Sequence, residues 1–290
     1  MQKFKEAIFI TGSGSGVGFA CTKFLLQQGY FVFGAVLNSL EKEHVEKEFK
    51  ENFLAIPLNI TSTEECAQAY ELVRSELKDM HLRALINVAG VIYNGPLMDV
   101  PKQQFEHILA VNTIGVHLIS QALLPLLETT QGRNKIINIS SQSGLRTLPF
   151  TGIYSASKFA LEALSNAMRY EYSVFGIDVA LIEPGQIQTP MADQIIRNIQ
   201  VKPSHKIYDT PMQIFFKQTK LSFESGIPIQ KITSTIYQAL TSQSPKFRYP
   251  IHNDYFRDAI LFRKFPIKLQ DILIRKALRL NPISQQSIKE

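Results

Sequence analysis

A tyrosine and a lysine, Tyr154 and Lys158, lie four residues apart in a segment of helical character. This spacing places both side chains on one face of a helix. A free tyrosine has a pKa of about 10, which is too high for proton transfer near neutral pH. A neighbouring ammonium group favours the phenolate and lowers that pKa. The pair is therefore suited to exchange a proton with a substrate hydroxyl or carbonyl.

A serine, Ser141, precedes the tyrosine by thirteen residues, at the end of an apolar run that predicts a strand. A hydroxyl at a strand end can hold, by hydrogen bonding, the same oxygen that exchanges a proton with the tyrosine. A tyrosine and a lysine at this spacing also occur by chance on helices. The argument for catalysis therefore depends on the serine and on a glycine-rich turn near the start of the chain.

That turn runs from Thr11 to Gly18 with the sequence TGSGSGVG, between the first apolar run and the first helical segment. Glycines permit a tight turn and let backbone N–H groups approach a pyrophosphate closely. The helix N-terminus adds a favourable dipole for the anion. A plain strand–helix connection is the alternative. The position of the turn, at the first strand–helix junction, favours a dinucleotide site.

Short β-rich apolar runs alternate with longer segments of helical period over the first two thirds of the chain. This alternation predicts an α/β fold, with a parallel sheet covered by helices on both faces. Right-handed crossovers then give a single doubly wound Rossmann-type domain of about seven strands over residues 1–290. The predicted strands are 7–11, 31–37, 54–58, 84–87, 135–140, 178–183 and 246–249, and the predicted helices are 17–28, 40–51, 63–77, 101–127, 154–175 and 229–241. Ser62 and Glu65 have the spacing of a capping box, which predicts the start of the third helix.

Two segments of the last third do not follow the alternation. Residues 189–225 combine apolar and aromatic side chains with three prolines, and we expect them to form a lid over a hydrophobic substrate. Residues 262–280 mix six basic residues with leucines and isoleucines. They predict a helix docked on its own domain, which we favour, or an interfacial helix that makes peripheral contact with a membrane.

The composition is that of a globular protein, with 45% hydrophobic and 19% charged residues in a chain of 290. The net charge is +6, but the basic residues are dispersed until the last segment, so we expect no nucleic-acid partner. The two cysteines cannot form a disulfide scaffold, and the histidines show no metal-ligand spacing. The sequence shows no signal-peptide pattern and no uninterrupted apolar stretch of about 18 residues, so we expect a cytoplasmic protein.

Together these motifs resemble the short-chain dehydrogenase/reductase family, over about residues 5 to 190. The family's glycine turn matches residues 11–18, its Asn-Asn-Ala-Gly motif matches 87–90, and its serine, tyrosine and lysine match Ser141, Tyr154 and Lys158. Asn112 matches an asparagine of the fourth helix, and residues 184–185 match a Pro-Gly pair. The surrounding sequence resembles the branch that holds retinol, hydroxysteroid and 3-hydroxybutyrate dehydrogenases.

The resemblance implies an NAD(P)-dependent oxidoreductase that interconverts an alcohol and a carbonyl by hydride transfer, on a steroid-, retinoid- or lipid-like substrate. Tyr154 is implied as the general acid/base, and Lys158 as the residue that lowers its pKa and holds the nicotinamide ribose. Ser141 is implied to orient the reacting oxygen, and Asn112 to anchor a water of a proton relay. The implied cofactor-binding residues are Thr11, Gly12, Ser15, Gly16, Val17, Gly18, Leu37, Asn38, Asn59, Ile60, Asn87, Ala89, Gly90, Tyr154, Lys158, Pro184, Gly185, Ile187 and Thr189. Relatives are often dimers or tetramers, so we also expect a homo-oligomer.

Three positions depart from the family pattern. Val88 replaces the second asparagine of Asn-Asn-Ala-Gly, and Asn59 replaces the usual acid after the third strand. The end of the second strand, residues 36–39, has neither an acid for a ribose 2′-hydroxyl nor an arginine for a 2′-phosphate. Without a cation for the phosphate, NAD is favoured over NADP. A non-catalytic NAD(P)-sensing protein on the same fold is the alternative function, and the intact Ser141, Tyr154 and Lys158 argue against it.

Overall fold

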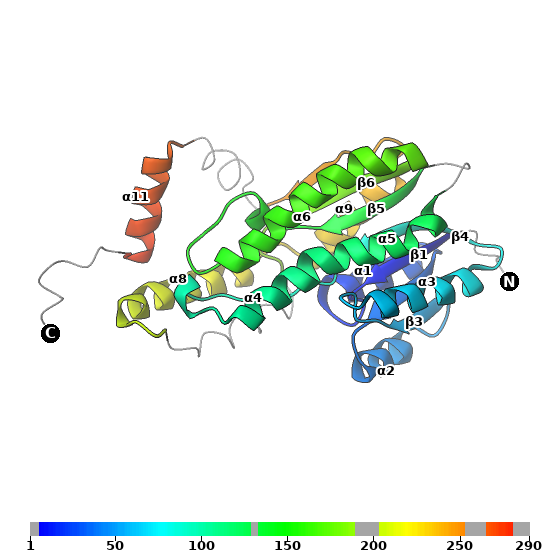
Figure 1. Cartoon of the computed structure of the whole chain (residues 1–290), viewed down its shortest axis with the longest axis horizontal. Coiled ribbons are helices and arrows are strands. Elements are labelled where there is room, and N and C mark those ends of the chain that lie inside the picture. The colour runs from blue at the N-terminus through cyan, green and yellow to red at the C-terminus, as the bar shows by residue number, and fades with distance from the viewer. Residues whose placement is uncertain (1–5, 129–132, 189–202, 253–264, 281–290) are drawn as a thin grey trace, which may run out of the picture.

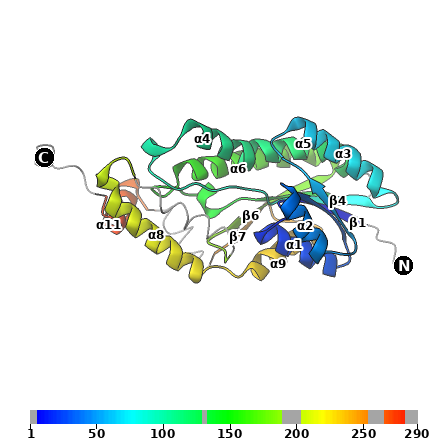
Figure 2. The same ribbon diagram turned by 90° about the horizontal axis from the view of Figure 1, so that it is seen from below.

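Seven parallel strands form one sheet in the computed structural model, with helices on both faces (Figures 1 and 2). The structure describes residues 6–128, 133–188, 203–252 and 265–280. The strand order is β3-β2-β1-β4-β5-β6-β7, so the sheet grows from β1 first to one side and then to the other. The prediction of a doubly wound α/β fold is confirmed. In such sheets ligands bind where the strand order reverses, which here lies between β1 and β4.

The strands and helices follow the predicted alternation. The strands are β1 (Glu6–Thr11), β2 (Phe31–Val36), β3 (Phe53–Pro57), β4 (His81–Asn87), β5 (Asn134–Ile139), β6 (Ile177–Pro184) and β7 (Arg248–Ile251). The helices are α1 (Gly16–Gln27), α2 (Ser39–Glu48), α3 (Thr63–Leu77), α4 (Lys102–Leu109), α5 (Val116–Leu127), α6 (Gly152–Glu171), α8 (Asp209–Glu224), α9 (Ile229–Thr241) and α11 (Ile267–Leu278).

The two faces of the sheet bury separate cores because successive side chains of a strand point to opposite sides. In β1, Ile8 and Ile10 pack with α1 and α9, whereas Ala7 and Phe9 pack with α3, α5 and α6. Burial of each large apolar side chain contributes about 1.5–3 kcal/mol. The near-continuous apolar strands thus account for a sheet that is covered on both sides.

The predicted capping box fixes the start of α3, but only half of it forms. The hydroxyl of Ser62 accepts a hydrogen bond from the Glu65 N–H at 3.1 Å. The Glu65 carboxylate does not return to Ser62, and accepts instead from the Asn59 N–H at 2.7 Å. Glu65 therefore fastens the chain after β3 to the first turn of α3.

One continuous helix spans Lys102–Leu127, through α4, a π-helical turn (Ala110–Gly115) and α5. By length and composition alone it is apolar enough to cross a membrane. Its residues contact β4, α3 and α6, and Ile119, Leu123 and Leu127 are fully buried. We therefore describe it as a core helix of the domain.

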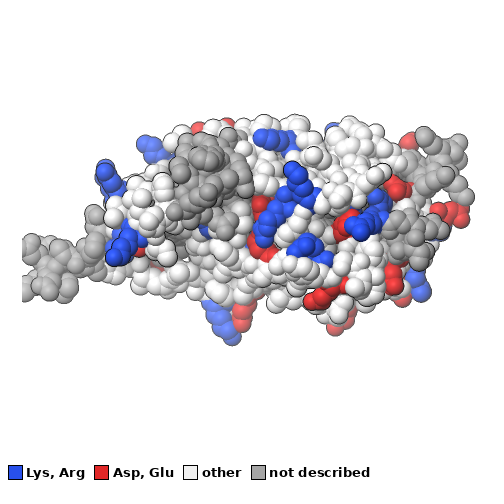
Figure 3. Space-filling model, turned by 90° about the horizontal axis from the view of Figure 1, so that it is seen from above, with Lys and Arg blue, Asp and Glu red and all other residues white. Residues whose placement is uncertain are grey.

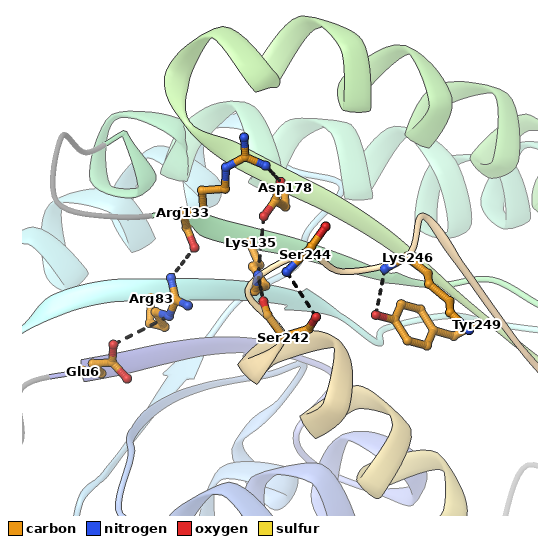
Figure 4. Close-up of polar contacts among 9 residues, drawn as sticks. All are labelled: Glu6, Arg83, Arg133, Lys135, Asp178, Ser242, Ser244, Lys246 and Tyr249. Atoms are coloured by element: carbon orange, nitrogen blue, oxygen red, sulfur yellow. Dashed lines mark hydrogen bonds and ion pairs between the residues drawn. The ribbon is translucent and has the colours of Figure 1, made fainter.

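A polar network lies at the amino-terminal edge of the sheet (Figure 4). At its centre is Lys135 of β5, which is only 1% exposed. Its Nζ donates to the carbonyl of Ser242, the C-cap of α9, at 2.7 Å and lies 3.4 Å from the Asp178 carboxylate. Arg133 pairs with the other oxygen of the same carboxylate at 3.1 Å. Burial lowers the pKa of Lys135, and the charge of Asp178 opposes this effect.

Replacing Lys135 by methionine is expected to lower the free energy of unfolding by about 1–3 kcal/mol, because a helix-end carbonyl and a carboxylate lose a buried partner. Urea denaturation followed by circular dichroism measures this change. The control is Lys102→Met, which removes an exposed ion pair with Glu106 and should change stability by less than about 0.5 kcal/mol. Equal midpoints for the two variants would contradict a structural role for Lys135.

Candidate active site

A cavity of about 890 Å³ opens at the carboxyl-terminal edge of the sheet. It is lined by the glycine turn, by the segments that follow β2 to β6, and by α6 and α8. Most of the predicted cofactor residues lie on its wall. They are Gly12, Ser15, Gly16, Val17, Gly18, Leu37, Asn59, Ile60, Ala89, Gly90, Tyr154, Lys158, Pro184, Gly185 and Ile187.

Three predicted cofactor residues do not line the cavity and support its wall from behind. Thr11 accepts hydrogen bonds on its hydroxyl from the N–H groups of Val88 and Ala89, at 3.0 and 3.1 Å. The amide of Asn87 donates to the Asn138 side chain at 2.8 Å and is buried. Asn38 caps α2, as described below. The cofactor-binding role that the resemblance implies for these three residues stays a prediction. Thr189 lies outside the described residues.

The glycine turn has the shape that a pyrophosphate requires. Gly16 adopts a φ of 54°, in the left-handed region that favours glycine. A Cβ at Gly18 would lie 2.0 Å from the carbonyl oxygen of Gly12, so helix α1 begins in direct contact with the strand end. Gly16 lines the cavity and has no side chain, so the backbone of the turn is open to the cavity at this residue. The residues present fit a dinucleotide phosphate held at the start of α1.

The predicted serine, tyrosine and lysine come together at the ends of α6 and β5. A hydrogen bond links the side chains of Tyr154 and Ser141. The Nζ of Lys158 lies 5.9 Å from the centre of the Tyr154 ring and donates to the carbonyl of Ile139 at 2.9 Å. The hydroxyl of Ser141 also accepts from the Ser143 N–H at 3.1 Å, which fixes its direction. All three residues line the same cavity.

The pKa values of this group differ from the prediction. Burial raises the pKa of Tyr154, and the hydrogen bond with Ser141 opposes this only in part. Burial lowers the pKa of Lys158 to about 8, while the charge of Glu162 opposes the change. The prediction that Lys158 brings the tyrosine pKa below its ordinary value is therefore wrong for this structure. Burial is the main cause of the raised tyrosine pKa, and Ser141, not Lys158, is the group that opposes it.

Asn112 lies within the π-helical turn between α4 and α5, and its side chain is directed at the loop after β4. Its Oδ1 accepts from the Val91 N–H at 2.8 Å, and its amide donates to the Val91 carbonyl at 2.9 Å and to Ser157 at 3.0 Å. A Cβ at Gly90 would lie 3.3 Å from Asn112 Oδ1 and 3.8 Å from Lys158 Nζ. Asn112 thus ties the cavity loop to α6 immediately behind the lysine.

Glu41 is a cavity residue that the sequence analysis did not select. It lies in the first turn of α2, and its carboxylate accepts from the Leu37 N–H at 2.8 Å. Asn38 accepts from the Glu41 N–H at 3.0 Å, so the segment closes as an N-terminal capping motif. A Cβ at Gly14 would lie 2.5 Å from the Glu41 carboxyl carbon. A carboxylate therefore lies beside the glycine turn, at the end of β2. The Asn38-x-x-Glu41 spacing is typical of an N-terminal capping motif and could have indicated this position from the sequence.

Helix α8 forms the outer wall of the cavity. Its residues Phe215, Gln218, Thr219, Ser222 and Phe223 line the space. Figures 1 and 2 show α8 at one end of the molecule, with α11 beside it. Part of the predicted lid, residues 189–202, lies outside the described residues. The described part contributes both aromatic and hydroxyl or amide side chains to the wall.

Known proteins resemble this chain in sequence and in fold. The sequence profile described as short chain dehydrogenase matches residues 6–200. A 17-beta-hydroxysteroid dehydrogenase type 6 of Bos taurus is 31% identical over 283 residues, which cover 93% of this chain and 88% of that protein. An NADPH-dependent 3-dehydrocapnine reductase of Ornithobacterium rhinotracheale is 30% identical over 250 residues, 83% of this chain and 86% of that protein. The fold is similar to that of a short-chain dehydrogenase from Streptomyces avermitilis, with a TM-score of 0.77, 21% identity, and coverage of 97% of this chain and 100% of that one.

Proposed function

The chain belongs to the short-chain dehydrogenase family and is an NAD(P)-dependent oxidoreductase, and we propose that it interconverts a hydrophobic alcohol and its carbonyl compound. The observation that carries this proposal is the presence of Ser141, Tyr154 and Lys158, side by side, on the wall of a cavity that the glycine turn also lines. A proton donor, an oxygen-binding hydroxyl and a phosphate-binding turn are the parts that such a reaction needs.

The residues of the cavity have different roles in this reaction. When bound, the nicotinamide cofactor supplies or accepts the hydride. Tyr154 gives a proton to the carbonyl oxygen in reduction and takes it from the hydroxyl in oxidation. Ser141 holds the same oxygen by a hydrogen bond. Lys158, beside Gly90, would hold the ribose hydroxyls, and the turn around Gly16 would hold the pyrophosphate.

The substrate class is inferred from the outer part of the cavity. Apolar side chains of the wall include Ile92, Leu148, Phe215 and Phe223. These favour a steroid-, retinoid- or lipid-like alcohol over a small polar one. The test is a panel of androstane alcohols, all-trans-retinol and long-chain secondary alcohols beside glycerol and ethanol. Turnover of glycerol and ethanol alone would contradict the proposed class.

Glu41 supports a preference for NAD over NADP. A carboxylate beside the glycine turn can accept a hydrogen bond from a ribose 2′-hydroxyl and repels a 2′-phosphate. The relative named above as NADPH-dependent shows that the family does not decide the question. Together with the absence of a basic residue in the turn sequence, the position of Glu41 favours NAD.

Replacing Glu41 by glutamine is expected to lower the ratio of kcat/KM with NAD to that with NADP by about tenfold or more, because about 1.4 kcal/mol of discrimination corresponds to a factor of ten. Side-by-side titrations with NADH and NADPH measure the same change in affinity. Glu43→Gln, an exposed position of the same helix, is the matched control. An unchanged ratio in Glu41→Gln would show that the carboxylate does not select the cofactor.

Peripheral membrane contact through α11 is part of the proposal. Leu278, Ile274 and Leu280 pack against residues of α8, as expected for a docked helix. Ile267, Ile272 and Leu273 of this helix are nevertheless exposed, and the basic residues Arg275 and Lys276 lie in its last turn. Figure 3 shows lysine and arginine side chains bordering an uncharged surface at this end of the molecule. Co-sedimentation with phosphatidylglycerol vesicles, which Ile272→Glu should weaken, tests this contact.

A homo-oligomer and a cytoplasmic location complete the proposal. Exposed Phe105, Ile114 and Phe159 lie on α4, the π-helical turn and α6, which contact one another, and such an apolar face suits a second copy. Light scattering after size exclusion, with Phe159→Glu as the disrupted variant, tests the oligomer. Cys21 and Cys66 are free and buried, which suits a reducing compartment, and cell fractionation tests the location.

A further inference from the structure

A row of three side chains on α6 is bonded to three consecutive residues at the end of β5. The row consists of residues four apart, so they lie on one helix face. The pairs are Tyr154 with Ser141, Lys158 with the Ile139 carbonyl, and Glu162 with the Ser140 hydroxyl. Glu162 is the member of this row that the reaction described above does not use.

Glu162 is 6% exposed and belongs to a charged cluster behind the cavity. Its second carboxylate oxygen accepts a hydrogen bond from Arg248 of β7, and the same guanidinium binds Glu183 of β6. Glu183 is 2% exposed, and burial and the charge of Glu162 hold its pKa above the ordinary value. Three strands and α6 therefore meet at this carboxylate, through Ser140, Lys158, Glu183 and Arg248.

The loop that contains Ser141 packs directly against this charged cluster. A Cβ at Gly144 would lie 3.0 Å from Glu162 Cγ and 3.0 Å from the Ser140 hydroxyl. The Ser140 N–H also donates to the Ile182 carbonyl of β6 at 2.8 Å. A displacement of Glu162 would therefore move the residue before Ser141 and the turn after it.

Glu162 also acts on the ammonium group of Lys158. Burial alone would lower the pKa of that lysine further than it does, because the negative charge of Glu162 opposes desolvation. The pKa of the lysine that would hold the ribose hydroxyls thus depends on a carboxylate one helical turn away. Arg248, in turn, forms an ion pair with Glu162 in this buried place.

We propose that Glu162 is a positioning residue of the active site, which fixes the strand end before Ser141 and acts on the ammonium group of Lys158 one helical turn away, while Arg248 holds it in place from β7. The alternative is an ion cluster that stabilises the fold and has no effect on the reaction. Two variants separate these roles. Glu162→Gln retains an acceptor for Ser140 but lacks the charge, whereas Glu162→Ala lacks both.

The first experiment titrates Lys158 directly in the full chain without substrate, by NMR of the lysine side-chain carbons, with the signal assigned from Lys158→Arg. In Glu162→Gln we expect the pKa of Lys158 to fall by about half a unit or more from its value near 8. Glu171→Gln, at the exposed end of α6, should leave it unchanged. An unchanged lysine pKa in Glu162→Gln would overturn the electrostatic part of the proposal, whatever the substrate of the enzyme is.

The second experiment depends on the proposed function and uses the best alcohol of the panel described above. For Glu162→Gln we expect the limb of the pH–rate profile that reports the titration of Lys158 to move to lower pH. For Glu162→Ala we expect kcat to fall by about tenfold or more. Arg248→Lys should restore part of the activity lost in Arg248→Met. Lower thermal stability with kcat, KM and pH profile unchanged would overturn the proposal in favour of a structural cluster. Failure of every alcohol, with the lysine titration as expected, would instead contradict the proposed substrate class.

Discussion

Replacing Tyr154 by phenylalanine is expected to lower kcat/KM by about a thousandfold, with cofactor affinity within about threefold of the unmodified enzyme. The half-buried ring of Tyr154 lies beside Lys158, and phenylalanine keeps that packing while it removes the hydroxyl bonded to Ser141. Only the proton transfer and one hydrogen bond are lost. The loss should therefore appear in the chemical step and not in folding.

Steady-state kinetics on the preferred alcohol, together with an NADH fluorescence titration, measure the two quantities separately. Tyr170→Phe, an exposed position on the same helix, is the matched control and should retain full activity. A Tyr154→Phe enzyme with more than about a tenth of the original turnover would exclude Tyr154 as the acid/base. Cofactor binding by the unmodified protein without turnover of any alcohol would instead support the non-catalytic sensing protein.

Replacing Gly18 by alanine is expected to weaken NADH binding by about a hundredfold. The added methyl group would lie 2.0 Å from the Gly12 carbonyl oxygen and 2.6 Å from its carbon. Both are backbone atoms, so α1 and the strand end must separate. Overpacking of this kind costs about 1–3 kcal/mol, and it displaces the N–H groups that would hold the pyrophosphate.

Fluorescence titration with NADH measures the affinity, and a thermal melt shows how much folded protein is present. Gly95→Ala is the control, because its added methyl group would meet only the flexible side chain of Tyr93, at 3.3 Å or more. If Gly18→Ala bound NADH as tightly as the control, the glycine turn would not be the phosphate site.

The parts of the fold that depend on local pattern were predictable from the sequence. The alternation of apolar runs and helical segments identified the parallel sheet, and α3 and α9 have the predicted bounds. Residues 141, 154 and 158 could be selected because a strand end and one helix face fix their spacing. The start of β4 was missed by three residues, because His81 and Arg83 at its exposed end resemble a loop.

The parts that depend on how elements pack were not predictable. Glu41 lines the cavity because the first turn of α2 packs against the end of β2, where the Glu41 carboxylate accepts a hydrogen bond from the Leu37 N–H. Asn38, beside it in sequence, is used as the cap of that helix. The pKa of Tyr154 was predicted in the wrong direction because the sequence shows the nearby lysine but not the depth at which both groups are buried.

The turn at Ala110–Gly115 sets the phase between two halves of one long helix. A π-helical turn holds one residue more than an α-helical turn, so removal of one residue from this segment would leave a regular α-helix in which Ile119 and Leu123 still face the sheet. Asn112 lies within the turn and would be displaced from Val91 and Ser157. A single-residue deletion in this segment should thus disturb the wall of the cavity far more than the packing of the two halves of the helix.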